Sequence, residues 1–204
     1  MELVLAFITL IFLAPIGLYV WYVAIHVPKR GRQRQEQSWR PLADRIGGQL
    51  VATSGVSRFH VLTVPFGHAT VRALVFDRAA HDPALPSMRA EFGGWRTFVQ
   101  AEVPGGRGMP LSIEPRGSSR GGVPTGHPAL DAGHVVTPLL ATPPNAISWR
   151  VNTNLEQPLA VLADRYSYVQ AGPSFVNLEI PGVCTDAVLL EAALRVVGTL
   201  AQPA

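Results

Sequence analysis

Residues 3–27 of the chain read LVLAFITLIFLAPIGLYVWYVAIHV, and no acidic, lysine or arginine side chain interrupts them. At about 1.5 Å per residue, a helix of this length would reach about 37 Å, which is enough to cross the ~30 Å hydrocarbon core of a bilayer. The stretch therefore predicts one transmembrane anchor over residues 1–28. A folded domain would then follow a short linker over residues 29–40.

The charges beside this stretch predict its orientation. Lys29, Arg30, Arg32 and Arg34 all follow the apolar residues, whereas only Glu2 precedes them. Positive side chains remain on the cytoplasmic side of a membrane, so the N-terminus would lie outside and the domain in the cytoplasm. The stretch is too long for the apolar core of a signal peptide, and it ends without a good cleavage site. An anchor in the cell inner membrane is thus expected.

Four further residues of the stretch are candidates for positions in such an anchor. Tyr19, Trp21 and Tyr22 gather near its basic end, where an aromatic belt would contact lipid headgroups. Pro15 lacks a backbone N–H and would kink the helix near its middle. His26 could ligate a haem or a chlorophyll, but an amphipathic side chain at headgroup level is the interpretation that the sequence favours.

The positive charge of the chain is confined to the predicted linker. Residues 29–40 carry five basic side chains and Glu36, whereas residues 41–204 carry 12 arginines against 12 acidic side chains. A nucleic-acid surface needs a concentrated basic face, so none is expected on the domain. The linker could contact anionic membrane lipids, at about 1 kcal/mol for each charge, or could act only as a topology signal.

Residues 41–204 are long enough for one domain with its own core. Cys184 is the only cysteine, so neither an internal disulfide nor a multi-cysteine metal site can form. The chain has a single lysine, Lys29, and many alanines, arginines and prolines, a composition typical of a bacterium with GC-rich DNA.

The apolar pattern of this domain predicts an α+β fold. Residues 95–103 alternate, with Trp95, Thr97, Val99, Ala101 and Val103 on one face. Hairpins are expected where apolar runs flank short glycine-containing turns. The predicted strands are residues 59–66, 70–76, 95–103, 111–114, 134–139, 168–170 and 175–180. Because several of these form consecutive hairpins, we expect an antiparallel sheet with helices packed on one face.

Three helices are predicted to cover that sheet. The first carries Trp39, Leu42 and Ile46 on one face and ends at Gly47 and Gly48. The second runs over residues 154–166. The third runs over residues 186–200, with Thr185 as its expected N-cap.

Residues 127–134 contain the one arrangement with metal-ligand spacing. His127, Asp131 and His134 could supply three ligands, but Pro128 and Gly133 argue against a regular helix that would place them on a common face. Loop residues without a metal are therefore the preferred interpretation. The other histidines, His60, His68 and His81, are expected at or near strands of the first hairpin rather than in a cluster.

No motif in the sequence identifies a reaction. The glycine-rich loops at residues 105–108 and 117–122 lack the ending of a phosphate-binding loop. Cys184 precedes a predicted helix, yet no base is assigned to it. The sequence therefore predicts no catalytic residue, no metal and no cofactor, and a protein that is not an enzyme.

The predicted function follows from the predicted anchor. The first hypothesis is an accessory or structural subunit that stabilises a larger bacterial membrane complex of respiratory, photosynthetic or secretion type. Its partners would be membrane lipids and other integral membrane subunits, and no nucleic acid. The alternative is a membrane-tethered sensor or adaptor that binds a soluble partner or ligand. A membrane-bound enzyme without a recognisable motif is the third hypothesis.

Overall fold

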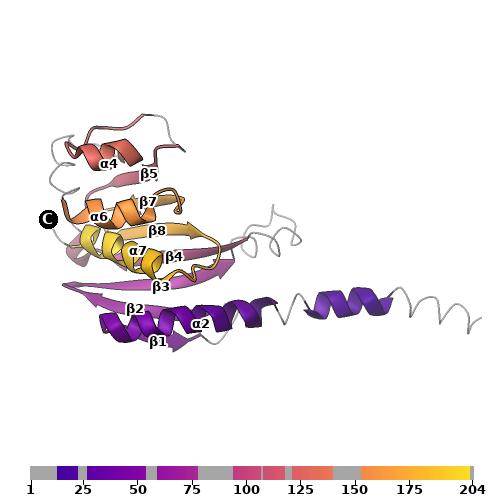
Figure 1. Cartoon of the computed structure of the whole chain (residues 1–204). Coiled ribbons are helices and arrows are strands. Elements are labelled where there is room, and N and C mark those ends of the chain that lie inside the picture. The colour runs from indigo at the N-terminus through magenta and orange to yellow at the C-terminus, as the bar shows by residue number, and fades with distance from the viewer. Residues whose placement is uncertain are drawn as a thin grey trace, which may run out of the picture.

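In the described part of the chain, eight strands form one antiparallel sheet (Figure 1). The computed structural model describes residues 13–22, 27–53, 59–77, 94–106, 108–117, 121–139 and 153–202. The order of the strands across the sheet is β1-β2-β3-β4-β8-β7-β5-β6. Their bounds are β1 Gln49–Ala52, β2 His60–Phe66, β3 Ala69–Asp77, β4 Trp95–Glu102, β5 Leu111–Pro115, β6 His134–Pro138, β7 Tyr168–Ala171 and β8 Phe175–Pro181.

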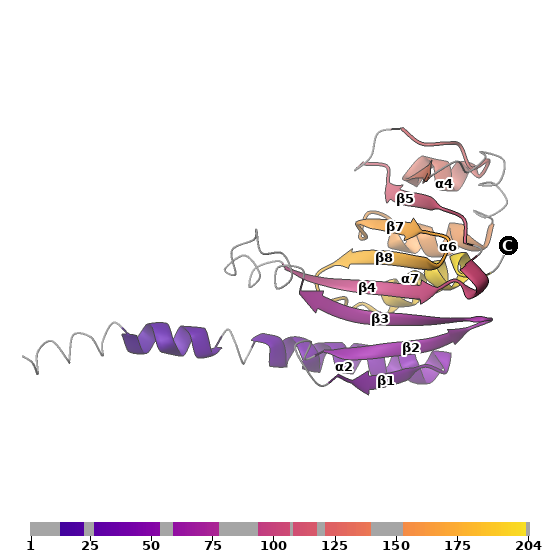
Figure 2. The same ribbon diagram turned by 180° about the vertical axis from the view of Figure 1, so that it is seen from behind.

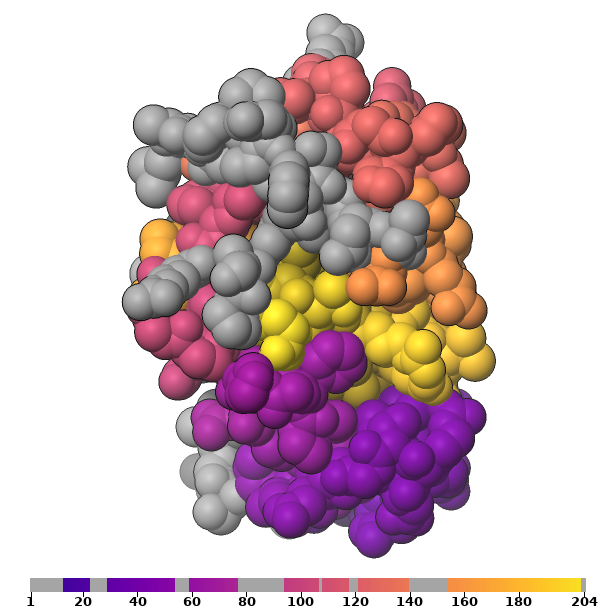
Figure 3. All heavy atoms as spheres, turned by 90° about the vertical axis from the view of Figure 1, so that its left-hand side faces the viewer, coloured from indigo at the N-terminus to yellow at the C-terminus, as the bar shows by residue number. Residues whose placement is uncertain are grey.

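The helices α2, α6 and α7 lie on one face of this sheet, so the view from behind shows the strands in front of them (Figure 2). The helices are α2 Val27–Ile46, α4 Pro128–Gly133, α6 Thr153–Leu162 and α7 Ala187–Leu200, and a short 3-10 helix, η3, covers Pro104–Gly106. In the space-filling view, the yellow residues of the C-terminal part lie between the indigo and purple residues near α2 and the orange residues of α6 (Figure 3).

The core forms between the sheet and these helices. The alternation predicted for residues 95–103 is confirmed, because Thr97, Val99, Ala101 and Val103 are buried while Gln100 is exposed. On α7, nine of the fourteen residues are buried, which an amphipathic helix achieves only when it packs along its length. The sheet and its covering helices therefore share one continuous apolar core.

Two buried side chains of α2, Trp39 and Gln35, form hydrogen bonds with the rest of the domain. The Trp39 indole is fully buried, and its Nε1 donates a hydrogen bond of 2.7 Å to the carbonyl oxygen of Cys184. The Gln35 side chain is also fully buried. Its Nε2 donates to the His60 carbonyl oxygen at 2.9 Å, and the His60 backbone N–H donates to its Oε1 at 2.8 Å. A buried amide paired on both sides satisfies groups that would otherwise destabilise the interface.

The start of α7 differs by one residue from the expectation. Asp186, not Thr185, is the N-cap, and its Oδ1 accepts hydrogen bonds from the backbone N–H groups of Val188 and Leu189. These bonds, together with the Arg165 guanidinium 2.9 Å from the other oxygen, hold the pKa of the Asp186 carboxyl below its ordinary value. The carboxylate is thus kept charged where the helix N-terminus favours a negative group.

The predicted transmembrane anchor is wrong. Within the described ranges of the chain, no helix combines the length and the apolarity that crossing a bilayer requires. Residues 13–22 are helical within the described part of the chain. The next helix, α2, includes the basic residues from Lys29 onward instead of leaving them in a linker. The rest of the expected stretch lies outside the described residues.

The predictions that depended on this anchor are wrong as well. They are the transmembrane part of the fold class, the inner-membrane location and the role of a membrane-anchored subunit, sensor or enzyme. The α+β domain is confirmed, as is the antiparallel sheet with helices on one face. Three elements were not expected: the edge strand β1, the short 3-10 helix η3, and α4, which forms despite Pro128 and Gly133.

Candidate functional site

The face of the sheet that α2, α6 and α7 leave uncovered carries the candidate site (Figure 2). Successive residues of a strand point to opposite faces, so each strand that buries one set of side chains against the helices presents the other set here. We call this surface the open face. In β3 it carries Thr70 and Arg72, which are exposed, while Val71 and Ala73 are buried on the helix side.

A row of polar side chains crosses the open face in register. Neighbouring strands pair in such a way that one polar residue of each strand lies beside a polar residue of the next. In sheet order the row contains Gln49, Thr63, Arg72, Gln100, Asn177, Gln170, Ser112 and Thr137. Directly opposed side chains of a sheet lie within about 5.5 Å of one another, so a bound molecule could contact several of them at once.

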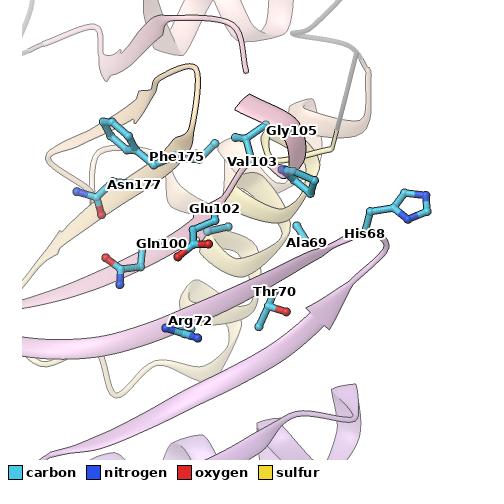
Figure 4. A pocket seen from close by; sticks show the side chains of 13 residues that line it. His68, Ala69, Thr70, Arg72, Gln100, Glu102, Val103, Gly105, Phe175 and Asn177 are labelled. Carbon is cyan, nitrogen blue, oxygen red and sulfur yellow. The ribbon is translucent and has the colours of Figure 1, made fainter. Parts of the chain in front are cut away.

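The middle of this row opens into a hollow of about 620 Å³ (Figure 4). We call it the polar hollow. Its lining includes His68, Thr70 and Arg72 from β3 and the turn before it, Gln100 and Glu102 from β4, and Phe175 and Asn177 from β8. The turn that contains η3 adds Pro104 and Gly105 to one side. The volume is within the range of small-molecule sites.

The polar hollow offers hydrogen-bonding groups of both kinds. The side-chain oxygen of Asn177 is buried and has no hydrogen-bond partner in the described part of the protein. A buried acceptor without a partner costs free energy, which a ligand donor would recover. The charges of Arg72 and Glu102 balance, so the hollow favours neither anions nor cations by net charge.

The residues with metal-ligand spacing do not converge. His127 lies 3.1 Å from Glu156 at the start of α6, and Asp131 accepts hydrogen bonds from the backbone and hydroxyl of Thr125. His134 is buried, and its Nδ1 lies 2.9 Å from the hydroxyl oxygen of Tyr166. Among the described residues, no group of three His, Cys, Asp or Glu side chains is placed to hold a metal.

Two buried histidines predict how stability depends on pH. Burial lowers the pKa of His134 and, helped by Arg32, that of His60 from the ordinary value of 6.5. Below pH 6.5 the unfolded chain therefore binds protons that the folded chain does not, so stability should fall as the pH drops. Urea unfolding between pH 7.5 and 5 should show this slope, and His134→Gln should flatten it. A slope that is the same in the native protein and in His134→Gln would contradict the assignment.

The other candidate residues named from the sequence lie in different parts of the domain. Cys184 is buried, and burial raises the pKa of its thiol to about 11, so it is a poor nucleophile at neutral pH. His68 is exposed at the rim of the polar hollow, whereas His60 is buried beneath α2. Of the two glycine-rich loops, the first contributes Gly105 to the hollow. His26 and His81 lie outside the described residues.

The residues expected in the anchor and linker are described in two helices. Tyr19, Trp21 and Tyr22 are 54%, 50% and 42% exposed in the helix over residues 13–22, which also contains Pro15. Lys29, Arg30 and Arg34 are exposed on α2, and Arg32 is half-buried. Contact of these side chains with lipids or with other subunits stays a prediction.

Sequence reasoning missed the polar hollow, because no motif marks it. The signal was present in the second face of the alternating stretch, where Gln100 and Glu102 follow one another at strand spacing. The local sequence does not indicate that Arg72 and Asn177 lie in the same row. They are brought together because β4 pairs with β8, a strand that is distant in the sequence.

Comparisons with known proteins give one structural likeness. No family model matches the sequence, and no curated protein matches it. The crystal structure of the mycobacterial trehalose monomycolate transport factor A is similar, with a TM-score of 0.53 and 10% sequence identity, over 83% of this chain and 94% of that one. At this identity the likeness shows the fold alone. That protein is described as a transport factor.

Proposed function

We propose that this protein is a non-enzymatic binding factor that holds an uncharged, hydroxyl-bearing group in the polar hollow of its open face. The observation that carries the proposal is the row of polar side chains in register across the sheet, with the hollow at its centre. A solvated sheet face can carry such a row without loss of free energy. Solvation alone does not, however, require the hollow or a side-chain oxygen of Asn177 without a hydrogen-bond partner.

The composition of the polar hollow favours sugar-like hydroxyl groups. The carboxamides of Gln100 and Asn177 each provide two donors and an acceptor, which suits hydroxyl groups that both donate and accept. Arg72 supplies donors and Glu102 supplies acceptors without a net charge. Phe175 is 46% exposed beside them, and an aromatic ring at this position offers an apolar face to the C–H side of a sugar ring.

The structural likeness supports a role in binding. A transport factor has to hold a molecule or a partner and release it unchanged, which requires a site with recognition groups and no reacting groups. The protein with the similar fold is named as a factor in trehalose monomycolate transport. We infer a binding role of this type for the present chain, with the polar hollow as its site.

A neutral disaccharide tests the proposal. Maltose titrated into the full-length protein should shift the backbone amide NMR signals of residues 70–72, 100–102 and 175–177. Gln100→Ala together with Asn177→Ala removes two hydrogen-bonding groups, so maltose affinity should fall about tenfold. Gln170→Ala is the matched control, because this exposed carboxamide belongs to the same row but does not line the hollow.

The control separates the hollow from the row as a whole. If Gln170→Ala weakens maltose binding as much as the double variant does, the hollow is not the site. If maltose produces no shifts around the hollow at high concentration, the assignment of hydroxyl-bearing ligands is wrong. Circular dichroism of each variant should remain that of the native protein, since these side chains lie on the open face and not in the apolar core.

A further inference from the structure

A strip of apolar side chains continues the open face beyond the polar hollow. Leu74 pairs with Phe98 in register, one row on from the pair of Arg72 and Gln100. The ring of Phe76 packs edge-on against Phe98, with 6.2 Å between the ring centroids and 83° between the planes. Val61, on β2, points to the same face because it precedes Thr63 by two residues. We call Val61, Leu74, Phe76 and Phe98 the apolar strip.

The position of this strip is unusual for a solvated sheet face. Antiparallel sheets normally bury apolar side chains on one face and present polar ones on the other. Here Leu74, Phe76 and Phe98 are only partly buried, although the helices α2, α6 and α7 all lie on the opposite face. Val51, in line with Val61 on the edge strand, is 54% exposed. The open face is thus divided into a polar part and an apolar part that adjoin.

An ion pair bounds the apolar strip toward β8. Glu179 pairs with Phe98 in register, and the Arg96 Nε lies 3.3 Å from its Oε1. Glu179 is 3% exposed, so its carboxylate is buried and does not contribute a charge to the surface of the open face. The strip therefore runs from the polar hollow along β3 for two steps of the strand repeat, about 13 Å. On β4 it includes Phe98 alone, because the next open-face residue, Arg96, is charged.

We infer that the ligand of the polar hollow is an amphiphile whose alkyl chain lies along the apolar strip. This inference rests on the proposed function, because the hollow has to receive the polar head. The strip begins where the hollow ends, in the next row of the same two strands, so one molecule with a head and a chain covers both. Covering the strip removes from water the apolar surface that the helices leave uncovered.

A series of alkyl glucosides tests the inference. Methyl, hexyl and octyl β-D-glucoside, each below its micelle-forming concentration, should be titrated into the full-length protein and followed by amide NMR shifts around Arg72 and Gln100. Each methylene that leaves water can tighten binding by up to about fourfold, so octyl glucoside should bind at least tenfold more tightly than methyl glucoside. The shifts of residues 74–76 and 98 should change only with the longer chains.

Two variants assign the chain-length effect to the strip. Val61→Thr with Leu74→Thr gives both strands a β-branched residue, which suits a strand, and should reduce the gain from methyl to octyl to less than threefold. Val188→Thr, at a 62% exposed position of α7, should leave the gain unchanged. Binding of alkyl chains to the exposed residues 13–22 is common to all variants and cancels in this comparison.

The outcomes separate this inference from the proposed function. If all three glucosides bind the hollow equally well, the alkyl-chain site is wrong while the hollow remains a site for hydroxyl groups. If the gain with chain length survives Val61→Thr and Leu74→Thr, the chain lies elsewhere, and the inference is also overturned. If no glucoside shifts the signals of the hollow, both the inference and the proposed function fail.

Discussion

Replacement of Trp39 with alanine should lower the free energy of unfolding by about 4 kcal/mol. The indole is fully buried where α2 meets the core, and its loss leaves both a cavity and an unpaired Cys184 carbonyl oxygen. Chemical unfolding followed by circular dichroism gives the value. An exposed residue of the same helix, Gln37, provides the control, because Gln37→Ala should change stability by less than about 0.5 kcal/mol.

A second variant divides the effect into packing and hydrogen bonding. Trp39→Phe retains most of the apolar volume but removes the donor, so it should lose about 1–3 kcal/mol. A loss from Trp39→Ala no greater than that from Trp39→Phe would mean that the contact of α2 with the core contributes little. The helix would then be fastened chiefly by Gln35 and its two hydrogen bonds with His60.

Replacement of Gly198 with valine should destabilise the protein by about 3 kcal/mol through overpacking. A β-carbon at this position of α7 would lie 2.4 Å from Cγ of Phe66, a distance that real contacts do not reach. The helix therefore has to move away from β2, or the ring has to leave its position. Thermal and urea unfolding should both report the loss, although valine favours a helix more than glycine does.

A double-mutant cycle checks that mechanism. Phe66→Ala removes the ring that a side chain at position 198 would contact, so Gly198→Val should cost far less in that background. If the cost is the same with and without Phe66, the close approach of α7 to β2 is not its cause. Val188→Ala, at an exposed position of the same helix, should have little effect in either background.

The part of the fold set by local patterns could be predicted from the sequence. Strand alternation over residues 95–103 and the apolar face of α7 each arise within one element, and both are confirmed. The end of α2 at Gly47, which has a φ of +69°, is of the same kind. Short elements were less predictable. The strand β1 has only four residues, and three of them are exposed. The helix α4 can begin at Pro128 because proline lacks only an N–H that a helix start does not use.

The predicted anchor failed because hydropathy was its main argument. The run of uncharged residues was treated as one helix. In the described part of the chain, residues 13–22 are helical, and α2, from Val27 onward, continues through the basic residues. The polar hollow was not predicted, because no local pattern in the sequence indicates it. Its residues belong to strands that are distant in sequence, and only the pairing of β4 with β8 places Gln100 beside Asn177.

That pairing also determines the order in which the chain can fold during synthesis. The strands β1 to β4 emerge from the ribosome in spatial order and can pair at once, but the free edge of β4 has to wait for β8. The helix α2 can contact β1 and β2 early, but two of its other partners, Cys184 and α7, are made last. Until then Trp39 lacks its hydrogen-bond partner, and the inner faces of β3 and β4 lack the cover of α7. A stalled chain that ends before β8 should therefore be recognised by chaperones, whereas a released full-length chain should not.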